Sequence, residues 1–403
     1  MKDHKDMFDT TDIKGKIILL RLDLNVPTAD GKVTDFTRID RVKPTIDALR
    51  ARGAKVAILS HFGRPKAAPD AKYSLAFLAP VLAQRWGTPV GFVDDCIGDV
   101  AKDAIAKLND GDVLLLENVR FHAGEEKDEP AFAAQLARLG QLYINDAFSV
   151  SHRAHASVHG IAKLLPAQAG LTMKAELKAL EAAVANPKRP VAAIVGGAKI
   201  STKLDLLTNL VSKMDILVLG GGMANTFLAS RGWKPEASLY EADMLDTARA
   251  ISEKAEETGC MIVLPVDGVV AEDYAPDAKH GVYLRTDMPA GWQVLDVGPE
   301  SVTLIEEALA DCKTILWNGP LGVFEMPNFA KGTNAIAKWV AAQTKKGAVV
   351  SVAGGGDTVA ALAQAGAEAD FTYVSTAGGA FLEWLEGKEL PGVSVLAKAQ
   401  LAA

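Results

Sequence analysis

Arginine and histidine residues follow several apolar runs in the first half of the chain. A guanidinium group matches carboxylate and phosphate geometry with paired hydrogen bonds, so these residues could hold a small anion carrying both groups. A single arginine is more often a solvated surface residue, but several placed after strand-like runs form a pattern. The candidate anion-binding residues are Arg21, Arg38, His61, Arg64, Arg120 and Arg153.

The segment SHRAHASVHG, residues 151–160, holds three of the seven histidines and one of these arginines. It could form a metal site, provide a catalytic base or bind an anion. His152 and His155 are three residues apart, and a zinc site would need a further close ligand that this spacing does not supply. We interpret the segment as an anion-binding surface anchored by Arg153, with His155 and His159 as structural hydrogen-bonding residues.

Glycine follows most of the apolar runs in the second half of the chain, as in VAAIVGG, DILVLGGG and AVVSVAGGG. Without a side chain, the backbone can adopt positive φ and its N–H groups can approach a phosphate closely. The segment GGGDT leads toward a helix start, which favours phosphate, and Asp357 could be an oxygen ligand for Mg²⁺. A simple strand-to-helix turn is the alternative, and neither G-x-x-x-x-G-K-[ST] nor G-x-G-x-x-G is present.

The segment GGAKISTK places two lysines directly after a glycine turn. Lys199 and Lys203 are four residues apart, so both could lie on one face at the start of a helix. Surface lysines are usually only solvated. Here the pair could instead neutralise the charge on a phosphoryl group during its transfer.

The apolar runs themselves predict the fold. They are short, rich in Val, Ile and Leu, and do not alternate strictly, as expected for strands covered on both faces. With helix-like segments between them, they predict α/β architecture with parallel sheets, and ligands bind beyond the carboxyl ends of such strands. The runs are residues 16–24, 54–61, 112–119, 141–148, 191–197, 215–222, 261–267, 314–320, 348–356 and 371–376.

Residues 171–187 separate two groups of strands and have the pattern of an amphipathic helix. Thr172 could cap the start of this helix, and Pro187 would end it. A surface helix within one domain is the alternative, but we expect two Rossmann-like three-layer lobes, 1–170 and 187–389, joined by a connecting helix at 171–186 and a hinge. The apolar stripe consists of Met173, Leu177, Leu180 and Val184.

Composition excludes several classes of protein. The 43 basic and 50 acidic residues give a net charge of −7, which argues against general binding to nucleic acid or anionic lipid. The sequence has no uninterrupted apolar run long enough for a membrane span, and residues 1–12 lack the apolar core of a signal peptide, so we expect a cytoplasmic protein. Cys96, Cys260 and Cys312 match no zinc or redox spacing, and we expect buried free thiols.

Together these motifs resemble those of phosphoglycerate kinases over essentially the whole chain. Each motif alone is weak evidence, but nine in the family's order are highly specific. The motifs are RLDLNVP (21–27), SHFGRP (60–65), LLENVRF (115–121), DAFSVSHRAHAS (146–157), GGAKISTKL (196–204), GGGMANTFL (220–228), WNGPLGVFE (317–325), GGGDT (354–358) and STAGGAFLEWLEG (375–387).

The resemblance implies reversible, Mg²⁺-dependent phosphoryl transfer between 1,3-bisphosphoglycerate and ADP. It implies that the first lobe binds 3-phosphoglycerate and that residues near 390–403 pack back on that lobe. The substrate-binding residues would be Arg21, Asp23, Asn25, Arg38, His61, Arg64, Arg120 and Arg153. The second lobe would bind the nucleotide through Gly197, Lys203, Gly221, Leu295, Asn318, Glu325, Gly354, Gly355, Gly356, Asp357 and Thr358.

Within this set, Asp357 would also coordinate Mg²⁺. By the same resemblance, transfer would rely on Arg38, Lys199 and the amides of Gly378 and Gly379, brought together when the lobes close. A carboxylate acceptor is already ionised at neutral pH, so no general base is needed. We expect a monomer that acts on small molecules.

The sequence departs from the family pattern at two positions. The family commonly has glycine where Ser149 and Ala377 stand, and alanine would be strained at position 377 if the turn there needs positive φ. Two other classes of function stay open from the residues alone. They are an NAD-dependent dehydrogenase, whose dinucleotide fingerprint we do not find, and a non-catalytic anion- or nucleotide-binding module.

Overall fold

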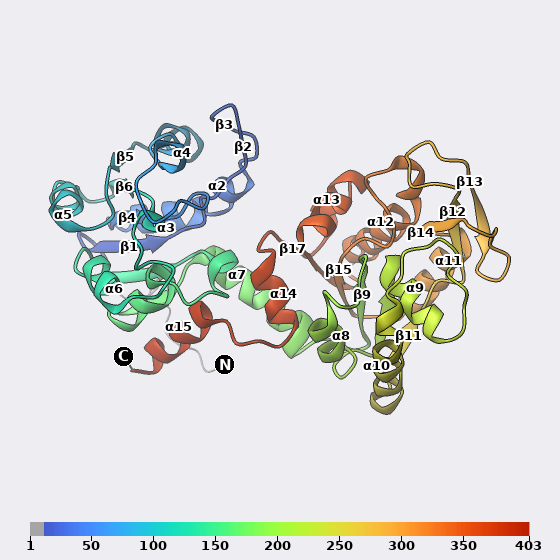
Figure 1. Ribbon diagram of the computed structural model, residues 1–403. Coiled ribbons are helices and arrows are strands. Elements are labelled where there is room, and N and C mark those ends of the chain that lie inside the picture. The colour runs from blue at the N-terminus through green and yellow to red at the C-terminus, as the bar shows by residue number, and fades with distance from the viewer. Residues whose placement is uncertain (1–11, 403) are drawn as a thin grey trace. The chain divides into compact units, whose positions relative to one another are not determined.

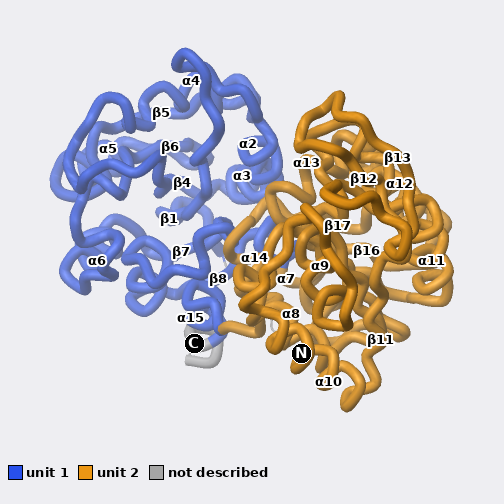
Figure 2. The backbone as a smooth tube through the Cα atoms, turned by 45° about the vertical axis from the view of Figure 1, so that its right-hand side comes forward, with its two compact units in different colours: residues 1–176, 389–403 blue, residues 177–388 orange. Residues whose placement is uncertain are grey.

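The computed structural model describes residues 12–402, and the chain divides into two compact units. Unit 1 combines the chain up to Glu176 with the segment that begins at Glu389, whereas unit 2 is the continuous segment Leu177–Lys388 (Figure 2). The polar stretch 1–11, where we expect no targeting segment, lies outside the described residues. Within the described residues, no helix is both long and apolar enough to cross a membrane.

Unit 1 is built on a six-stranded sheet in the order β5-β6-β4-β1-β7-β8, and all its strand pairs are parallel. Four of these strands coincide with predicted runs. The two edge strands, β5 and β8, were not predicted. The strands are β1 (Ile17–Arg21), β4 (Lys55–Leu59), β5 (Val90–Val93), β6 (Val113–Leu116), β7 (Leu142–Asn145) and β8 (Ala167–Ala169).

Helices cover this sheet on both faces, as expected for buried parallel strands (Figure 1). On one face, Leu20 pairs with Ile58 and Ile144 in register, and all three enter the core that holds Ile46 and Leu82. The helices are α2 (Thr37–Arg41), α3 (Lys43–Ala51), α4 (Leu78–Trp86), α5 (Gly98–Ala106), α6 (Pro130–Ala137) and α15 (Pro391–Ala402). The shorter elements are β2 (Thr28–Ala29), β3 (Lys32–Val33), η1 (Ala71–Tyr73), η2 (Val119–Phe121), η3 (Phe148–Val150), η4 (Ala156–Gly160) and η5 (Ile161–Lys163).

Unit 2 contains a second six-stranded parallel sheet, in the order β11-β10-β9-β15-β16-β17. All six strands coincide with predicted runs, so the predicted α/β class with parallel sheets is confirmed. The strands are β9 (Val191–Val195), β10 (Ile216–Leu219), β11 (Met261–Val263), β15 (Thr314–Asn318), β16 (Val350–Gly354) and β17 (Tyr373–Ser375).

Unit 2 also contains a three-stranded antiparallel sheet, β13-β12-β14, which the sequence reasoning did not predict. Its strands are β12 (Asp267–Ala271), β13 (His280–Leu284) and β14 (Gln293–Val297). The helices of the unit are α8 (Leu204–Leu210), α9 (Gly221–Ser230), α10 (Leu245–Thr258), α11 (Pro299–Leu309), α12 (Lys331–Lys345), α13 (Gly356–Ala365) and α14 (Gly379–Leu385). Shorter turns are η7 (Ala242–Met244), η8 (Pro327–Phe329) and η9 (Glu368–Asp370).

The helix predicted between the strand groups is present as α7 (Leu171–Leu180), continued by the π-helical turn η6 (Glu181–Ala185). The prediction that Thr172 caps its start is wrong. The Thr172 hydroxyl lies inside the first turn and donates to Arg41 O at 3.0 Å. The cap comes from β7's end instead, because Asp146 Oδ1 accepts from Met173 N at 2.7 Å. A distant carboxylate therefore fixes where this helix begins.

The three cysteines are free and buried, as predicted. Cys96 belongs to unit 1, and Cys260 and Cys312 belong to unit 2. Burial raises the pKa of Cys260 and of Cys312 to about 11, so both remain protonated thiols at neutral pH. In this state each behaves as a small apolar side chain.

Candidate functional site

Arg21 is the last residue of β1, so it lies where the parallel strands of unit 1 have their carboxyl ends. Its side chain is only 1% exposed. Arg21 Nε donates to Ser157 Oγ at 2.9 Å, and a terminal nitrogen lies 3.2 Å from His61 Nδ1, at the end of β4. The guanidinium is therefore held by groups from two other segments, which gives it a fixed position.

Asp23, two residues further along, links three predicted residues. Its carboxylate pairs with Arg38 NH1 at 2.9 Å, and the same nitrogen donates to Asn25 O at 2.7 Å. Ser149, one of the two departures from the family pattern, donates its hydroxyl to Asp23. Burial opposes ionisation of Asp23, but His61, Arg38 and the Ser149 hydrogen bond together leave its pKa lowered. Asp23 is thus an anion that orients Arg38.

The loop after β4 is tied to the other predicted residues through Gly63. Gly63 N donates to Asn25 Oδ1 at 2.8 Å, and Arg120 NH1 donates to Gly63 O at 2.7 Å. Arg120 also pairs through Nε with Glu126, at 3.2 Å. Arg64, the next residue in the loop, is exposed and able to meet a ligand from solvent.

In the histidine-rich segment, the structural role predicted for His159 is supported by a side-chain contact. His159 Nδ1 lies 2.6 Å from Asp128 Oδ2, and burial together with neighbouring guanidinium groups lowers the pKa of His155 to about 4. Arg153 Nε donates to His152 Nε2 at 3.2 Å. Among the described residues, the group with metal-ligand geometry lies outside this segment.

We call these residues of unit 1 the anion-binding surface. Positive charge is concentrated there. Burial lowers the pKa of Arg120, and the nearby Arg21 and Arg153 lower it further, although Glu126 acts in the opposite direction. Burial and the same kind of crowding also lower the pKa of His61 well below its usual value, so His61 is neutral at pH 7. The members are Arg21, Asp23, Asn25, Arg38, His61, Arg64, Arg120 and Arg153.

In unit 2, Lys199 and Lys203 lie in different environments, because both precede the first residue of α8. Lys203 lies just before α8 and points inward, where Nζ donates to Gly196 O and Asn318 Oδ1, both at 2.7 Å. Burial lowers its pKa to about 8, although the carboxylate of Asp357 opposes this. Lys199 lies in the preceding loop and is exposed. The prediction that both lysines share one face of a helix start is therefore wrong, because α8 begins only at Leu204.

Glycine at the end of β9 allows two loops to approach each other. A Cβ atom at Gly196 would lie 1.8 Å from Pro320 O, which no side chain could tolerate. The facing Gly319 has φ +97°, a conformation that glycine adopts readily, and its N–H donates to Thr358 Oγ1 at 2.7 Å. These contacts connect the ends of β9 and β15 to the start of α13.

The loop between β16 and α13 has the form expected for phosphate binding. Gly355 has φ +99°, and α13 then begins at Gly356 with Asp357 exposed in its first turn. Asn318 Nδ2 donates to Gly354 O at 2.9 Å and so ties this loop to the neighbouring strand end. The exposed carboxylate of Asp357 is a hard oxygen ligand and fits a magnesium ion that phosphate oxygens also coordinate.

A cavity of about 490 Å³ lies within unit 2 and adjoins this loop. Among its lining residues are five that the sequence predicted for the nucleotide: Gly197, Gly221, Leu295, Glu325 and Asp357. Its volume falls in the range of small-molecule sites. The antiparallel sheet supplies one wall through β14.

Arg285 and Asn225 are among the lining residues of this cavity that the sequence did not predict. Arg285, just after β13, stacks over the Trp233 ring at 4.9 Å and donates to Asn225 Oδ1 at 2.9 Å. Burial lowers the pKa of Arg285 to about 10. Asn225 lies in the GGGMANTFL motif, which is a signal that could have identified it. The local sequence around Arg285 contains no such signal.

The turn at Ala377 is unstrained. Ala377 is not among the residues of positive φ, and its N–H donates to Ser375 Oγ at 3.1 Å. The positive φ, +50°, falls on Gly378, which precedes α14. Gly379 is the first residue of that helix and is exposed. The alanine thus replaces a family glycine without a steric cost.

Comparisons with known proteins identify the family of the chain. A family model described as Phosphoglycerate kinase matches residues 8–388. The chain is 59% identical over 394 residues to the phosphoglycerate kinase of Sinorhizobium fredii, covering 98% of this chain and 99% of that protein. It is 57% identical over 400 residues to that of Agrobacterium fabrum, covering 99% and 100%. A solved phosphoglycerate kinase structure from Coxiella burnetii matches with a TM-score of 0.90 and 40% identity, covering 96% of this chain and 98% of that one.

Proposed function

Because the chain belongs to the phosphoglycerate kinase family, we propose a division of labour in which unit 1 binds the sugar acid and unit 2 binds the nucleotide. The chain is a glycolytic phosphoglycerate kinase. The reaction moves a phosphoryl group reversibly between 1,3-bisphosphoglycerate and ADP, giving 3-phosphoglycerate and ATP. We assign the lobes to 1–170 with about 390–403 and to 187–389, with 171–186 connecting them.

The anion-binding surface of unit 1 would hold 3-phosphoglycerate. Its guanidinium groups lie close enough to lower each other's pKa, as at Arg120, and a bound phosphate or carboxylate would relieve that repulsion. This crowding of fixed positive charge is the observation that carries the assignment. Asp23 and Asn25 would position Arg38 and the loop at Gly63, respectively.

The cavity in unit 2 would hold the nucleotide. Gly221, Leu295 and Asn318 would surround the adenosine, and Glu325 would meet the ribose. The phosphates would face Lys203 and the loop at the start of α13, where a helix N-terminus and positive-φ glycine favour oxygen anions. The remaining members of the set are Gly197, Gly354, Gly355, Gly356 and Thr358.

Enzymes of this family use a magnesium nucleotide, and we assign Asp357 as the protein ligand of that ion. When bound, Mg²⁺ supplies positive charge to the phosphate oxygens. Asp357 is suited to this role because its carboxylate is exposed in the first turn of α13. It also acts electrostatically on Lys203, so the two lie near one another.

The chemistry needs no general base. In the direction of ADP formation, an oxygen of the 3-phosphoglycerate carboxylate, ionised at neutral pH, forms a bond to the γ-phosphorus while the bond to the ADP oxygen breaks. The loose transition state carries its charge on the three equatorial oxygens, so catalysis rests on positioning and charge neutralisation. We assign that role to Arg38, Lys199 and the amides of Gly378 and Gly379. We further propose closure of the lobes, a monomer and a cytoplasmic location.

Two exposed residues test this division of labour without disturbing buried structure. Arg64→Ala should weaken 3-phosphoglycerate binding about 10- to 100-fold, the scale of a charge-assisted hydrogen bond, and leave Mg-ADP binding unchanged. Asp357→Asn should do the reverse. Calorimetric titration of each variant with each ligand measures both effects, and Arg138→Ala, exposed at the end of α6, is the matched control. Equal loss of both ligands in either variant would contradict the assignment.

A coupled assay with ATP and 3-phosphoglycerate tests the reaction itself. It should show ADP formation that depends on the sugar acid. A non-catalytic binding module would bind both ligands and form no ADP.

A further inference from the structure

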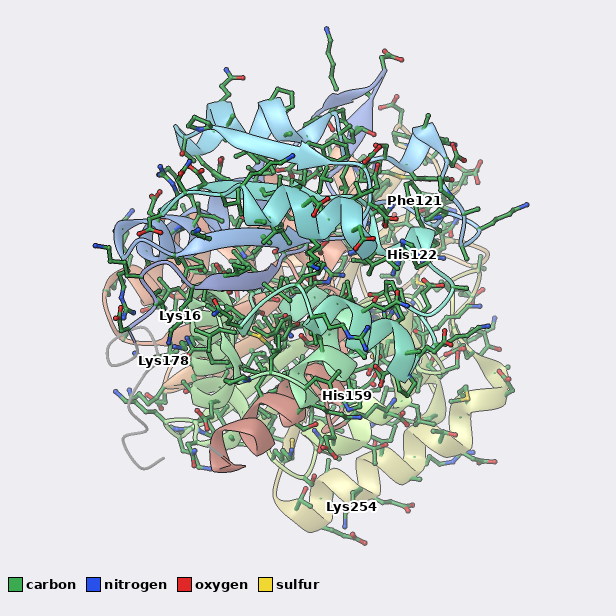
Figure 3. The ribbon with its side chains drawn as sticks, turned by 90° about the vertical axis from the view of Figure 1, so that its left-hand side faces the viewer. Lys16, Phe121, His122, His159, Lys178 and Lys254 are labelled. Carbon is green, nitrogen blue, oxygen red and sulfur yellow. The ribbon has the colours of Figure 1, made fainter. Side chains whose placement is uncertain are left out.

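Three potential metal ligands of different chemistry meet at the edge of unit 1, outside the anion-binding surface. Asp95 and Cys96 follow β5, and His122 follows η2, beside Phe121 (Figure 3). One ligand atom from each residue lies within 4.8 Å of the other two. The strands that lead to them, β5 and β6, are neighbours in the parallel sheet, so the fold brings their following loops to the same edge.

A thiol, an imidazole and a carboxylate form a donor set suited to a zinc-class ion. Zinc binds sulfur at about 2.3 Å and nitrogen or oxygen at about 2.0–2.2 Å, usually in tetrahedral geometry. His122 Nε2 now lies 2.8 Å from Asp95 Oδ1, and two tetrahedral ligands would be about 3.3 Å apart, so the pair must open by about 0.5 Å. Their side chains are 28% and 40% exposed, which leaves room for this movement and for a water as fourth ligand.

The charges around Cys96 also favour a cation. The buried thiol faces the carboxylates of Asp95, Glu125 and Glu117. Burial raises the pKa of Cys96 well above its usual value, and these carboxylates raise it further. A bound divalent ion would favour the thiolate over the thiol, because it stabilises the thiolate directly. The same carboxylates would also attract the ion. His122 faces Asp95 and stacks on Phe132, whose ring is 5.1 Å away.

We propose that Asp95, Cys96 and His122 form a binding site for a divalent transition-metal ion of the zinc class. The ion would bond Cys96 Sγ, a nitrogen of His122 and a carboxylate oxygen of Asp95. The thiol proton is released to solvent as the sulfur–metal bond forms, so no oxidant or reductant is involved. Binding would join the loop after β5 to η2, the turn that carries Arg120 of the anion-binding surface.

Titration of the metal-free full chain with Zn²⁺ alone tests the proposal. Calorimetry in buffers of different ionisation enthalpy should show one ion bound per chain and about one proton released. The affinity should rise about tenfold per pH unit, because binding releases the thiol proton. Co²⁺ in place of Zn²⁺ should give the absorption band of a thiolate–cobalt bond.

Variants locate the site. Cys96→Ser and His122→Gln should each lower Zn²⁺ affinity about 100-fold or more, and Cys96→Ser should abolish the cobalt–thiolate band. His122→Gln should disturb folding less than Cys96→Ser does, because the His122 side chain is partly exposed and Cys96 is buried. Cys260→Ser and Cys312→Ser are matched controls, since both thiols are buried in unit 2 and should leave binding unchanged.

Two results would overturn the proposal. One is the absence of Zn²⁺ binding to the wild-type chain at micromolar concentration. The other is binding that survives both His122→Gln and Cys96→Ser, because the ion would then be held elsewhere on the chain. Either result leaves the kinase assignment untouched, since none of these three residues belongs to it.

Discussion

Burial and nearby positive charge together decide the protonation of His61 and His155 in unit 1. The pKa of His155 is lowered to about 4, and that of His61 is also lowered well below its usual value. In both cases burial is the main cause and nearby guanidinium groups add to it. Both rings are therefore neutral at physiological pH and add no further positive charge. The anion-binding surface thus keeps a constant charge across the neutral pH range.

Lys203 behaves differently, because its pKa of about 8 lies close to physiological pH. Bound phosphate would raise that pKa, so nucleotide binding favours the protonated form. We therefore expect Mg-ADP affinity to be constant below about pH 8 and to fall by up to tenfold per pH unit above it. Calorimetric titration between about pH 7 and 9.5 measures this.

The matched variant for this pH dependence is Lys203→Met, which keeps the length of the side chain without the titratable group. Its Mg-ADP affinity should be weaker throughout and flat across the same pH range. If the wild-type curve were flat as well, Lys203 would not face the phosphates.

For individual residues, the sequence did not predict where each candidate side chain points. Lys199 and Lys203 were assigned one helix face, yet the helix begins one residue after Lys203, and the two separate into an exposed and an inward-facing lysine. The contacts of Arg285 and His122 could not be predicted, since each depends on a partner from a segment distant in the chain.

At the scale of elements, all ten predicted runs correspond to strands, because continuous runs of Val, Ile and Leu are typical of buried parallel strands. Three of the missed strands, β5, β8 and β13, lack this signal. β5 is interrupted by Gly91, and β8, with the sequence AQA, contains no Val, Ile or Leu. β13 alternates between exposed and half-buried residues, which is a period-two pattern and no continuous apolar run.

The close approach of β9's end to the loop after β15 leads to a prediction for Gly196. A methyl group there would lie 1.8 Å from Pro320 O, so Gly196→Ala must displace backbone and should destabilise unit 2 by about 1–3 kcal/mol or more. Gly196 O accepts from Lys203 Nζ, so Mg-ADP binding should weaken too. The midpoint of urea unfolding, followed by circular dichroism, measures the loss of stability.

Gly356→Ala provides the stability control, because a Cβ atom there meets nothing within 4 Å and the backbone φ is ordinary. Its unfolding midpoint should match that of the wild type. Equal midpoints for both variants would mean that the loop at Pro320 yields without cost.

At the scale of the whole molecule, the sugar acid and the nucleotide are assigned to separate units. The sequence predicted two lobes from the helix between two groups of strands. The discontinuity of unit 1, which includes the segment from Glu389 onward, entered only through the family resemblance. Composition and periodicity cannot predict it, because the sequence of a helix that follows unit 2 does not indicate which lobe the helix will contact.

With the two ligands on separate units, as we propose, transfer would need closure of the units, and closure would exclude water from the acyl phosphate. Small-angle X-ray scattering should therefore show a smaller radius of gyration with both 3-phosphoglycerate and a non-hydrolysable Mg-ATP analogue bound. Each ligand alone should cause less compaction. A radius that does not change in the ternary complex would contradict closure.

The return of the chain to unit 1 has a consequence for biosynthesis. Gly392 N donates to Ser151 O at 2.8 Å, and a side chain at position 392 would collide with Val158. Helix α15 therefore packs closely against the earlier residues of unit 1. That helix leaves the ribosome only after all of unit 2, roughly 10–40 s after the rest of unit 1 at common translation rates. Unit 1 therefore cannot complete its fold until α15 has been synthesised, although most of its residues are synthesised before those of unit 2.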